Sequence, residues 1–230
     1  MIKNIVLVHG AWADGSGWGE VHNILTAKGF NVTIVPNPNT SLAEDVRITK
    51  AVLSLQDGPT VLVGHSYGGA IISEVGEHPN VHALVYVAAF VLDAGESLFK
   101  MLKDAPPDPN SPILPPKEGI IWLDRAKFHA SFCADVPAAK AKFMADSQIP
   151  IGLAAFDADL TVAAWKTKKS WYIVSTEDKM IPPDAERGMA KRANAEVMEI
   201  KASHAVYISH AGEVANAIQK AAEVKVLETA

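Results

Sequence analysis

The segment VLVGHSYGGAII, residues 61–72, carries the residue types and the spacing of a nucleophilic serine. It contains the pattern GxSxG, in which Gly64 and Gly68 flank Ser66, and Gly69 follows. The pattern stands at the end of an apolar run and at the head of a helical segment, as a nucleophile elbow requires. Glycines beside the serine leave room for a turn sharp enough to expose its hydroxyl group. We therefore predict that Ser66 is a nucleophile.

A glycine-rich turn that binds a phosphate, or that merely bends the chain, is the alternative interpretation of this segment. GHSYGG lacks the lysine of GxxxxGK[ST] phosphate loops and the spacing of GxGxxG dinucleotide sites. The nucleophile is therefore the favoured interpretation. A serine hydroxyl is weakly nucleophilic at neutral pH, so it needs a general base, and the base needs a carboxylate to orient it.

Candidates for both partners follow two later apolar segments. WYIVS runs into TEDKMIPP, which places Glu177 and Asp178 directly after a predicted strand, and EVMEIK runs into ASHAVYIS, which places His204 after the next one. The carboxyl ends of parallel strands meet at one edge of a sheet, so these groups are expected close to Ser66. The chain order of serine, acid and histidine is the one that accompanies a nucleophile elbow.

The acid has a rival in another part of the chain. Asp93 follows the predicted strand at residues 81–90, so we expect it at the same edge of the sheet. We favour Asp178 as the acid and keep Asp93 and Glu177 as alternatives.

The other histidines and the cysteine give no sign of a metal site. In SHAVYISH, His204 and His210 are six residues apart and miss the i, i+4 spacing with which two helical histidines share a metal ion. We expect Ser209 to cap the last helix and His210 to lie at the surface. The one cysteine, Cys133, offers no cluster for zinc or iron–sulfur and is expected to be a small buried or half-buried apolar residue. We expect no metal and no organic cofactor.

Six short apolar segments are typical of strands buried on both faces of a sheet. They are NIVLVHG (4–10), NVTIVPN (31–37), PTVLVGH (59–65), VHALVYVAAF (81–90), SWYIVSTED (170–178) and AEVMEIK (195–201). The segments of helical period between and after them are GWGEVHNILTAKGF (17–30), SLAEDVRITKAVLSL (41–55), SYGGAIISEVGEH (66–78), PPDAERGMAKRAN (182–194) and HAGEVANAIQKAAEV (210–224). This alternation predicts an α/β fold with a mostly parallel six-stranded sheet flanked by helices.

One interval breaks the alternation. Residues 94–160 contain no convincing buried strand, and APPDPNSPILPP (105–116) holds six of the chain's 14 prolines. We predict a core formed by residues 1–93 and 161–230, with residues 94–160 inserted as a helical cap. An insertion at the carboxyl edge of the sheet can roof a ligand site.

Composition limits the partners. The chain has 230 residues, 49% of them hydrophobic and 20% charged, which is ordinary globular usage. A net charge of −5 argues against nucleic acid and anionic membrane surfaces, so we expect a small-molecule partner and leave a homodimer open. The N-terminal apolar run is too short for a signal peptide and no segment approaches a membrane span, so we expect a cytoplasmic protein.

Three motifs together resemble a known family. VLVHGAWADGSGW near the start, VGHSYGG, and TEDKMIP followed by KASHAVYIS resemble the α/β-hydrolase superfamily. Within it, the chain is similar to the small esterases grouped with plant methylesterases and hydroxynitrile lyases. The resemblance spans the core but not the insertion, and it implies an α/β-hydrolase fold. It also implies that Ser66 is the nucleophile, Asp178 the acid and His204 the base.

The resemblance carries further expectations about the reaction. The oxyanion hole of this family is made by two backbone amides, which here are those of Ala11 and Tyr67. The lyase branch has Thr or Asn in place of Gly10 and a lysine in place of Ala205, so the chain is expected to hydrolyse esters through an acyl-enzyme intermediate rather than to cleave cyanohydrins. A slow-turnover binding or receptor protein on the same fold is a second alternative.

The substrate is expected to be a small hydrophobic ester. Apolar side chains are frequent in the insertion, which favours a hydrophobic acyl or alcohol group. Trp12, Trp122 and Phe128 are the candidate pocket residues. Trp18 is a further aromatic near the predicted pocket entrance.

Overall fold

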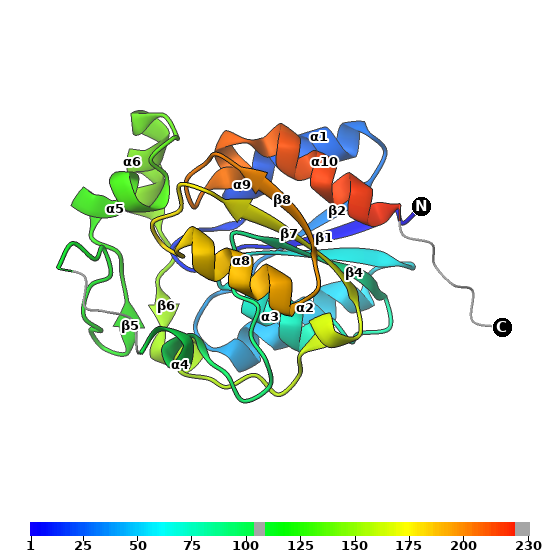
Figure 1. The fold of residues 1–230 in the computed structure, drawn as a ribbon, viewed down its shortest axis with the longest axis horizontal. Helices are drawn as coiled ribbons and strands as arrows, with labels where there is room; N and C mark the ends of the chain where they lie inside the picture. Colours follow the sequence, from blue (N-terminus) through cyan, green and yellow to red (C-terminus); the bar gives the residue numbers. More distant parts are fainter. Residues whose placement is uncertain (104–108, 224–230) are drawn as a thin grey trace.

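A single parallel sheet runs through the protein (Figure 1). The computed structural model describes residues 1–103 and 109–223. The strand order is β2-β1-β3-β4-β7-β8, and every neighbouring pair is parallel. The strands are β1 (Asn4–Val8), β2 (Asn31–Val35), β3 (Thr60–His65), β4 (Val81–Val87), β7 (Lys169–Ser175) and β8 (Glu196–Ile200). All six predicted strands are therefore confirmed, and so is the six-stranded parallel sheet.

The prediction that all six strands are buried on both faces is wrong for the two edge strands. Every residue of β1 and β3 is buried, whereas only the last residue of β2 and of β8 is buried. An edge strand has a neighbour on one side only, so part of it faces solvent even when its sequence is apolar.

Helices cover both faces of the sheet (Figure 1). The helices of one face are α1 (Gly19–Ala27) and α10 (Ala211–Ala222), and those of the other are α2 (Leu42–Ser54), α3 (Gly68–Val75) and α8 (Pro183–Arg192). Two short 3-10 helices, η1 (Gly15–Trp18) and η2 (Ala164–Lys166), lie in the connections. The Ser41 side chain accepts a hydrogen bond from the N–H of Glu44 and so caps α2, and a proline opens α8.

The start of the last helix differs from the prediction. A four-residue helix, α9 (Val206–Ser209), precedes α10, and the N-cap position of α10 is His210, whose side chain caps nothing. The hydroxyl of Ser209 donates instead to Asp135 Oδ2 at 2.8 Å. Ser209 is therefore not the N-cap of α10, since it is the last residue of α9. His210 is half-buried.

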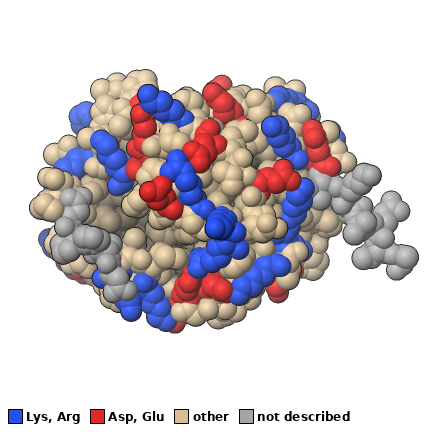
Figure 2. Space-filling model, viewed as in Figure 1, with Lys and Arg blue, Asp and Glu red and all other residues tan. Residues whose placement is uncertain are grey.

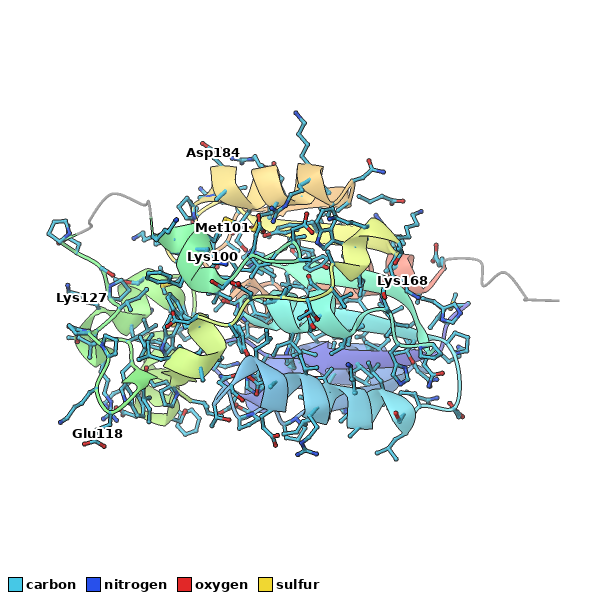
Figure 3. All side chains as sticks on the ribbon, turned by 90° about the horizontal axis from the view of Figure 1, so that it is seen from below. Lys100, Met101, Glu118, Lys127, Lys168 and Asp184 are labelled. Atoms are coloured by element: carbon cyan, nitrogen blue, oxygen red, sulfur yellow. The ribbon has the colours of Figure 1, made fainter. Side chains whose placement is uncertain are left out.

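The inserted segment lies at one end of the sheet. Its helices and strands are α4 (Leu98–Leu102), β5 (Ile120–Ile121), α5 (Arg125–Phe132), α6 (Ala138–Ser147), β6 (Ile151–Gly152) and α7 (Leu153–Phe156). Figure 3 shows Glu118 and Lys127 of this segment at one end of the molecule and Lys168 toward the opposite end. Residues 105–108 of the proline-rich stretch lie outside the described residues, and the division into core and cap at residues 93/94 and 160/161 stays a prediction.

The surface carries charges of both signs. On the face shown in Figure 2, acidic and basic side chains intermingle over the core. In residues 1–103 and 109–223, no helix combines the length and the apolar character that a membrane crossing needs.

Candidate active site

Ser66 stands in the turn between β3 and α3. Its φ is +54°, in the left-handed region that non-glycine residues rarely adopt. A Cβ on Gly64 would lie 2.5 Å from the carbonyl oxygen of Gly68, and one on Gly68 would lie 2.8 Å from that of Val8. The flanking glycines are needed because three backbone segments approach each other closely here. The turn has the strand–turn–helix geometry that the GxSxG pattern predicted.

A chain of hydrogen bonds links Ser66 to two later residues. Ser66 Oγ lies 2.9 Å from His204 Nε2, and His204 Nδ1 lies 2.5 Å from Asp178 Oδ2. The side chains of His204 and Asp178 are fully buried. A carboxylate can only accept, so the proton of a neutral imidazole is on Nδ1 and Nε2 is free to accept the hydroxyl proton of Ser66. This arrangement can draw a proton from the serine.

Local backbone holds the Asp178 carboxylate in place. Its Oδ1 accepts hydrogen bonds from the N–H groups of Met180 at 2.6 Å and Ile181 at 2.9 Å. These bonds leave Oδ2 directed at His204.

The two alternative acids are engaged elsewhere. Asp93 pairs with Lys166 at 2.5 Å, and that hydrogen bond lowers the pKa of Asp93. Glu177 is exposed enough to pair with Lys201 at 3.6 Å on the surface. The structure thus brings Asp178, rather than Asp93 or Glu177, to His204.

A second buried carboxyl group lies close to Asp178. Glu186, on α8, is fully buried, and its Oε2 accepts from the N–H of Ser175 at 3.0 Å. Its Oε1 has no hydrogen-bond partner among the described groups, although the carboxyl lies within hydrogen-bonding reach of Asp178. Burial, together with the charge of Asp178, raises the pKa of Glu186 well above its usual range. A protonated Glu186 can therefore donate to Asp178.

His65 supports the main chain of His204. Its Nε2 lies 3.0 Å from the carbonyl oxygen of His204, and the two rings are 4.7 Å apart. Burial lowers the pKa of His65 well below its usual value, so the ring is neutral and donates from Nε2 to the carbonyl. Burial likewise lowers the pKa of His9, which lies in the loop after β1.

A cavity opens beside Ser66, at the carboxyl ends of the strands. Its volume is about 30 Å³. Loops of the core and the inserted segment line it together, with Ala11, Trp12, Ser66, Tyr67, Phe90, Leu98, Leu102, Ile113, Ile151, Phe156, Met180 and Ile181. The inserted segment therefore forms part of the wall of this cavity.

Ala11 and Tyr67 both lie at this cavity. Within residues 1–103 and 109–223, neither of their amide N–H groups donates a hydrogen bond to the protein. Both amides are therefore free to bind an oxygen atom placed next to Ser66. A Cβ on Gly10, which precedes Ala11, would lie 2.6 Å from the Cβ of Ser66.

Of the three aromatic residues predicted for the pocket, the structure places one there. Trp12 lines the cavity, and its Nε1 donates to the carbonyl oxygen of Ile121 at 3.0 Å. Trp122 is 37% exposed, and Phe128 is buried in a stack with Phe132, with ring centroids 4.9 Å apart. Neither of them is among the residues around the cavity. Trp18 is fully buried core.

The inserted segment also contacts the loop that carries His204, which the sequence did not reveal. Asp135 accepts from the N–H of Ser203 at 3.1 Å and from the hydroxyls of Ser203 and Ser209. The ring of Phe132 packs edge-on against His204, with centroids 4.9 Å apart. No motif marks Asp135 or Phe132, because their partners are about 70 residues away in the chain.

Other groups that could bind a metal are scattered. In the part of the chain that the structure describes, no three His, Cys, Asp or Glu side chains gather as a metal site would require. Cys133 is buried, as predicted, and burial raises its pKa to about 12.

Comparison with known proteins gives relatives of similar length. The carbendazim hydrolyzing esterase of Nocardioides sp. (strain SG-4G) is 28% identical over 184 residues, which cover 70% of this chain and 74% of that protein. The pyrethroid hydrolase of Sphingobium wenxiniae is 26% identical over 246 residues, with 94% and 86% covered. Salicylic acid-binding protein 2 of Nicotiana tabacum is 28% identical over 232 residues, with 86% and 88% covered.

Solved structures and a family model agree on the fold. The pyrethroid hydrolase from Sphingobium faniae JZ-2 superposes with a TM-score of 0.81 at 24% identity, covering 97% of this chain and 98% of that one. Polyneuridine aldehyde esterase superposes with a TM-score of 0.81 at 20% identity, covering 96% of this chain and 99% of that one. At such identities these structures support the fold alone. The model of the Alpha/beta hydrolase family matches residues 5–217, so the chain belongs to the alpha/beta hydrolase family.

Proposed function

We propose that this protein hydrolyses carboxylic esters through an acyl-enzyme intermediate on Ser66. The observation that carries the proposal is the continuous hydrogen-bonded chain from Ser66 through His204 to the buried Asp178. Relatives that are named as esterases and hydrolases, at 26–28% identity, support the reaction class.

The reaction follows from the proton positions. Ser66 Oγ attacks the ester carbonyl carbon while His204 Nε2 takes the hydroxyl proton, and Asp178 stabilises the imidazolium that forms. The amides of Ala11 and Tyr67 bind the oxyanion of the tetrahedral intermediate. His204 then protonates the leaving alcohol as the C–O bond breaks. Water, deprotonated by His204, attacks the acyl-enzyme and releases the acid with a free Ser66.

The cavity walls favour a small apolar group next to the ester. The polar atoms of its two amphipathic aromatic residues are already bonded within the protein, Trp12 Nε1 to Ile121 and the Tyr67 hydroxyl to Asp45 at 2.7 Å. Among the described residues that line the cavity, Ser66 is the one whose side-chain hydroxyl these bonds leave for the substrate. We therefore propose a small hydrophobic ester as the substrate, with the inserted segment acting as its cap.

Two features weigh against the cyanohydrin-cleaving alternative. Gly10 and Ala205 differ from the residues that the resemblance implies for the lyase branch. We propose a cytoplasmic location on sequence grounds alone, and the sequence leaves a homodimer open.

The test compares the wild type with Ser66→Ala on short-chain p-nitrophenyl esters, with circular dichroism to verify folding. The proposal expects hydrolysis by the wild type and a loss of at least about 10³-fold in the variant. Cyanide release from mandelonitrile without ester hydrolysis would support the lyase instead. A folded wild type without either activity would favour a binding protein on the same fold.

A further inference from the structure

The direction of each proposed oxyanion donor depends on a carbonyl group on the opposite side of its peptide bond. A trans peptide unit is planar, so its C=O and its N–H point in opposite directions. The N–H of Ala11 shares a peptide unit with the carbonyl of Gly10, and the N–H of Tyr67 shares one with the carbonyl of Ser66. A hydrogen bond that holds either carbonyl therefore aims the amide across from it.

Backbone hydrogen bonds fix the peptide unit that contains the N–H of Tyr67. The carbonyl oxygen of Ser66 accepts from the N–H of Gly69 at 2.9 Å and from the N–H of Phe90 at 3.1 Å. The first bond belongs to the turn itself, and the second comes from the loop after β4. The direction of this amide is thus built into the elbow.

Side-chain hydrogen bonds fix the peptide unit that contains the N–H of Ala11. The carbonyl oxygen of Gly10 accepts from His9 Nδ1 at 3.0 Å and from Asn39 Nδ2 at 3.1 Å. His9 moves with the same loop, so Asn39, in the loop after β2, provides the anchor from another part of the fold.

Asn39 is itself fixed on every side. Its φ is +59°, its N–H donates to Asp45 Oδ1 at 2.9 Å, and its Oδ1 accepts from Asn37 Nδ2 at 2.8 Å. Asn37 Nδ2 also donates to the carbonyl oxygen of His9 at 3.2 Å. Asn37, Asn39 and Asp45 are all buried, although none of them touches the cavity.

Asp45 connects the two halves of the proposed oxyanion hole. While Oδ1 accepts from Asn39, Oδ2 accepts from the hydroxyl of Tyr67 at 2.7 Å. The Asp45 carboxylate, on α2, therefore links Asn39 to Tyr67, the residue that carries the second proposed oxyanion donor.

Resting on the proposed function, we infer that Asn39 and Asp45 are positioning residues of the oxyanion hole. Asn39 aims the amide of Ala11 through the carbonyl of Gly10. Asp45 fixes Asn39 and Tyr67 relative to each other. Burial raises the pKa of Asp45 to about 6, so at pH 8 it is ionised and can accept both hydrogen bonds.

The first test is Asn39→Gly. Glycine tolerates a φ of +59°, so the exchange removes the Nδ2 donor without straining the backbone. The matched control is Asn194→Gly, which makes the same exchange at an exposed residue with a φ of +48° before β8. We expect Asn39→Gly to lower kcat for a p-nitrophenyl ester at pH 8 by about 10- to 100-fold, since removing one oxyanion donor outright costs about 10²–10³-fold. KM should change less than about twofold.

The affinity for a trifluoromethyl ketone distinguishes a positioning role of Asn39 from a purely structural one. Its adduct with Ser66 carries an oxyanion, so its affinity should fall by the same factor as kcat/KM. The control should retain both the wild-type kcat and the wild-type affinity for the ketone.

A second variant decides the outcome if Asn39→Gly does not fold. Tyr67→Phe removes the hydroxyl that Asp45 accepts and leaves the Tyr67 amide in place. Its control is Tyr86→Phe, because Tyr86 is equally buried and its hydroxyl bonds Ser73 at 2.9 Å, within another part of the core. Tyr67→Phe should lower kcat and ketone affinity together, and Tyr86→Phe should lower neither.

The outcomes separate this inference from the proposed function. An active wild type, with Asn39→Gly and Tyr67→Phe no slower than their controls and no weaker in binding the ketone, would overturn the positioning role alone. A wild type that neither hydrolyses the ester nor binds the ketone would overturn the proposed function, and the positioning role with it.

Discussion

The close approach of Gly10 to Ser66 predicts that Gly10→Ala slows ester hydrolysis. The added Cβ would lie 2.6 Å from Ser66 Cβ and 2.8 Å from the carbonyl oxygen of His65. Ordinary contact begins at 3.4 Å, so the two Cβ atoms must separate by the difference, roughly 0.8 Å. Gly10 has no positive φ, so alanine is allowed by the backbone and the effect is one of space.

That displacement acts directly on the proposed nucleophile. Ser66 Oγ lies 2.9 Å from His204 Nε2, and a shift of roughly 0.8 Å along this line takes the pair beyond hydrogen-bonding distance. A misplacement of about 1 Å in a catalytic site costs about 100-fold in rate, or about 2.7 kcal/mol of barrier. We expect kcat for a short-chain ester to fall about 100-fold, and the free energy of unfolding to fall by about 1–3 kcal/mol through overpacking.

The assay measures kcat on p-nitrophenyl acetate and unfolding in urea for Gly10→Ala and for the control Gly212→Ala. A Cβ at Gly212, on α10, meets nothing within 4 Å, so the control should keep the wild-type kcat. A folded Gly10→Ala variant with kcat within twofold of the wild type would show that the nucleophile tolerates the added methyl group, contrary to this prediction.

The acid and its buried neighbour give two further predictions. Asp178→Asn should lower kcat by about 10³–10⁴-fold, because an amide stabilises neither the His204 tautomer nor its imidazolium, whereas Asp93→Asn should leave kcat within about twofold; the reverse result would make Asp93 the acid. The pKa of Glu186 is higher in the folded than in the unfolded protein, so the free energy of unfolding of the wild type falls as the pH rises above 4.5, the pKa in the unfolded chain. Glu186→Gln lacks this loss, so its gain in unfolding free energy over the wild type should grow from pH 5 to pH 8, by up to about 1.4 kcal/mol per pH unit, in urea denaturation. A gain that does not vary with pH would mean that Glu186 is ionised in the folded protein.

Local patterns explain which parts of the fold could be predicted. Buried parallel strands are near-continuous apolar runs, and a nucleophile elbow needs small residues at fixed spacing, so β3, Ser66 and α3 follow from the letters alone. Asp178 and His204 could be chosen because parallel strands bring their carboxyl ends to one edge. Their hydrogen bonds link residues that are far apart in sequence, and only the fold reveals them.

The inserted segment and the buried polar groups could not be predicted in this way. The presence of an aromatic residue in the insertion says little about which side it faces: Trp122, between β5 and α5, is exposed, and Phe128, on α5, packs in the core. Asp45 and Glu186 stand on helices, where acidic residues are usually solvated. Both are buried and bonded to groups outside their own helices: Asp45 to Asn39 and Tyr67, and Glu186 to the N–H of Ser175 at the end of β7.

Covalent labelling with a fluorophosphonate, followed by peptide mass spectrometry, tests directly whether Ser66 is the nucleophile. We expect one adduct per chain, on the peptide that contains Ser66, and no adduct in the Ser66→Ala variant. An unlabelled wild type that nevertheless hydrolyses esters, or an adduct on another residue that survives in Ser66→Ala, would contradict this expectation.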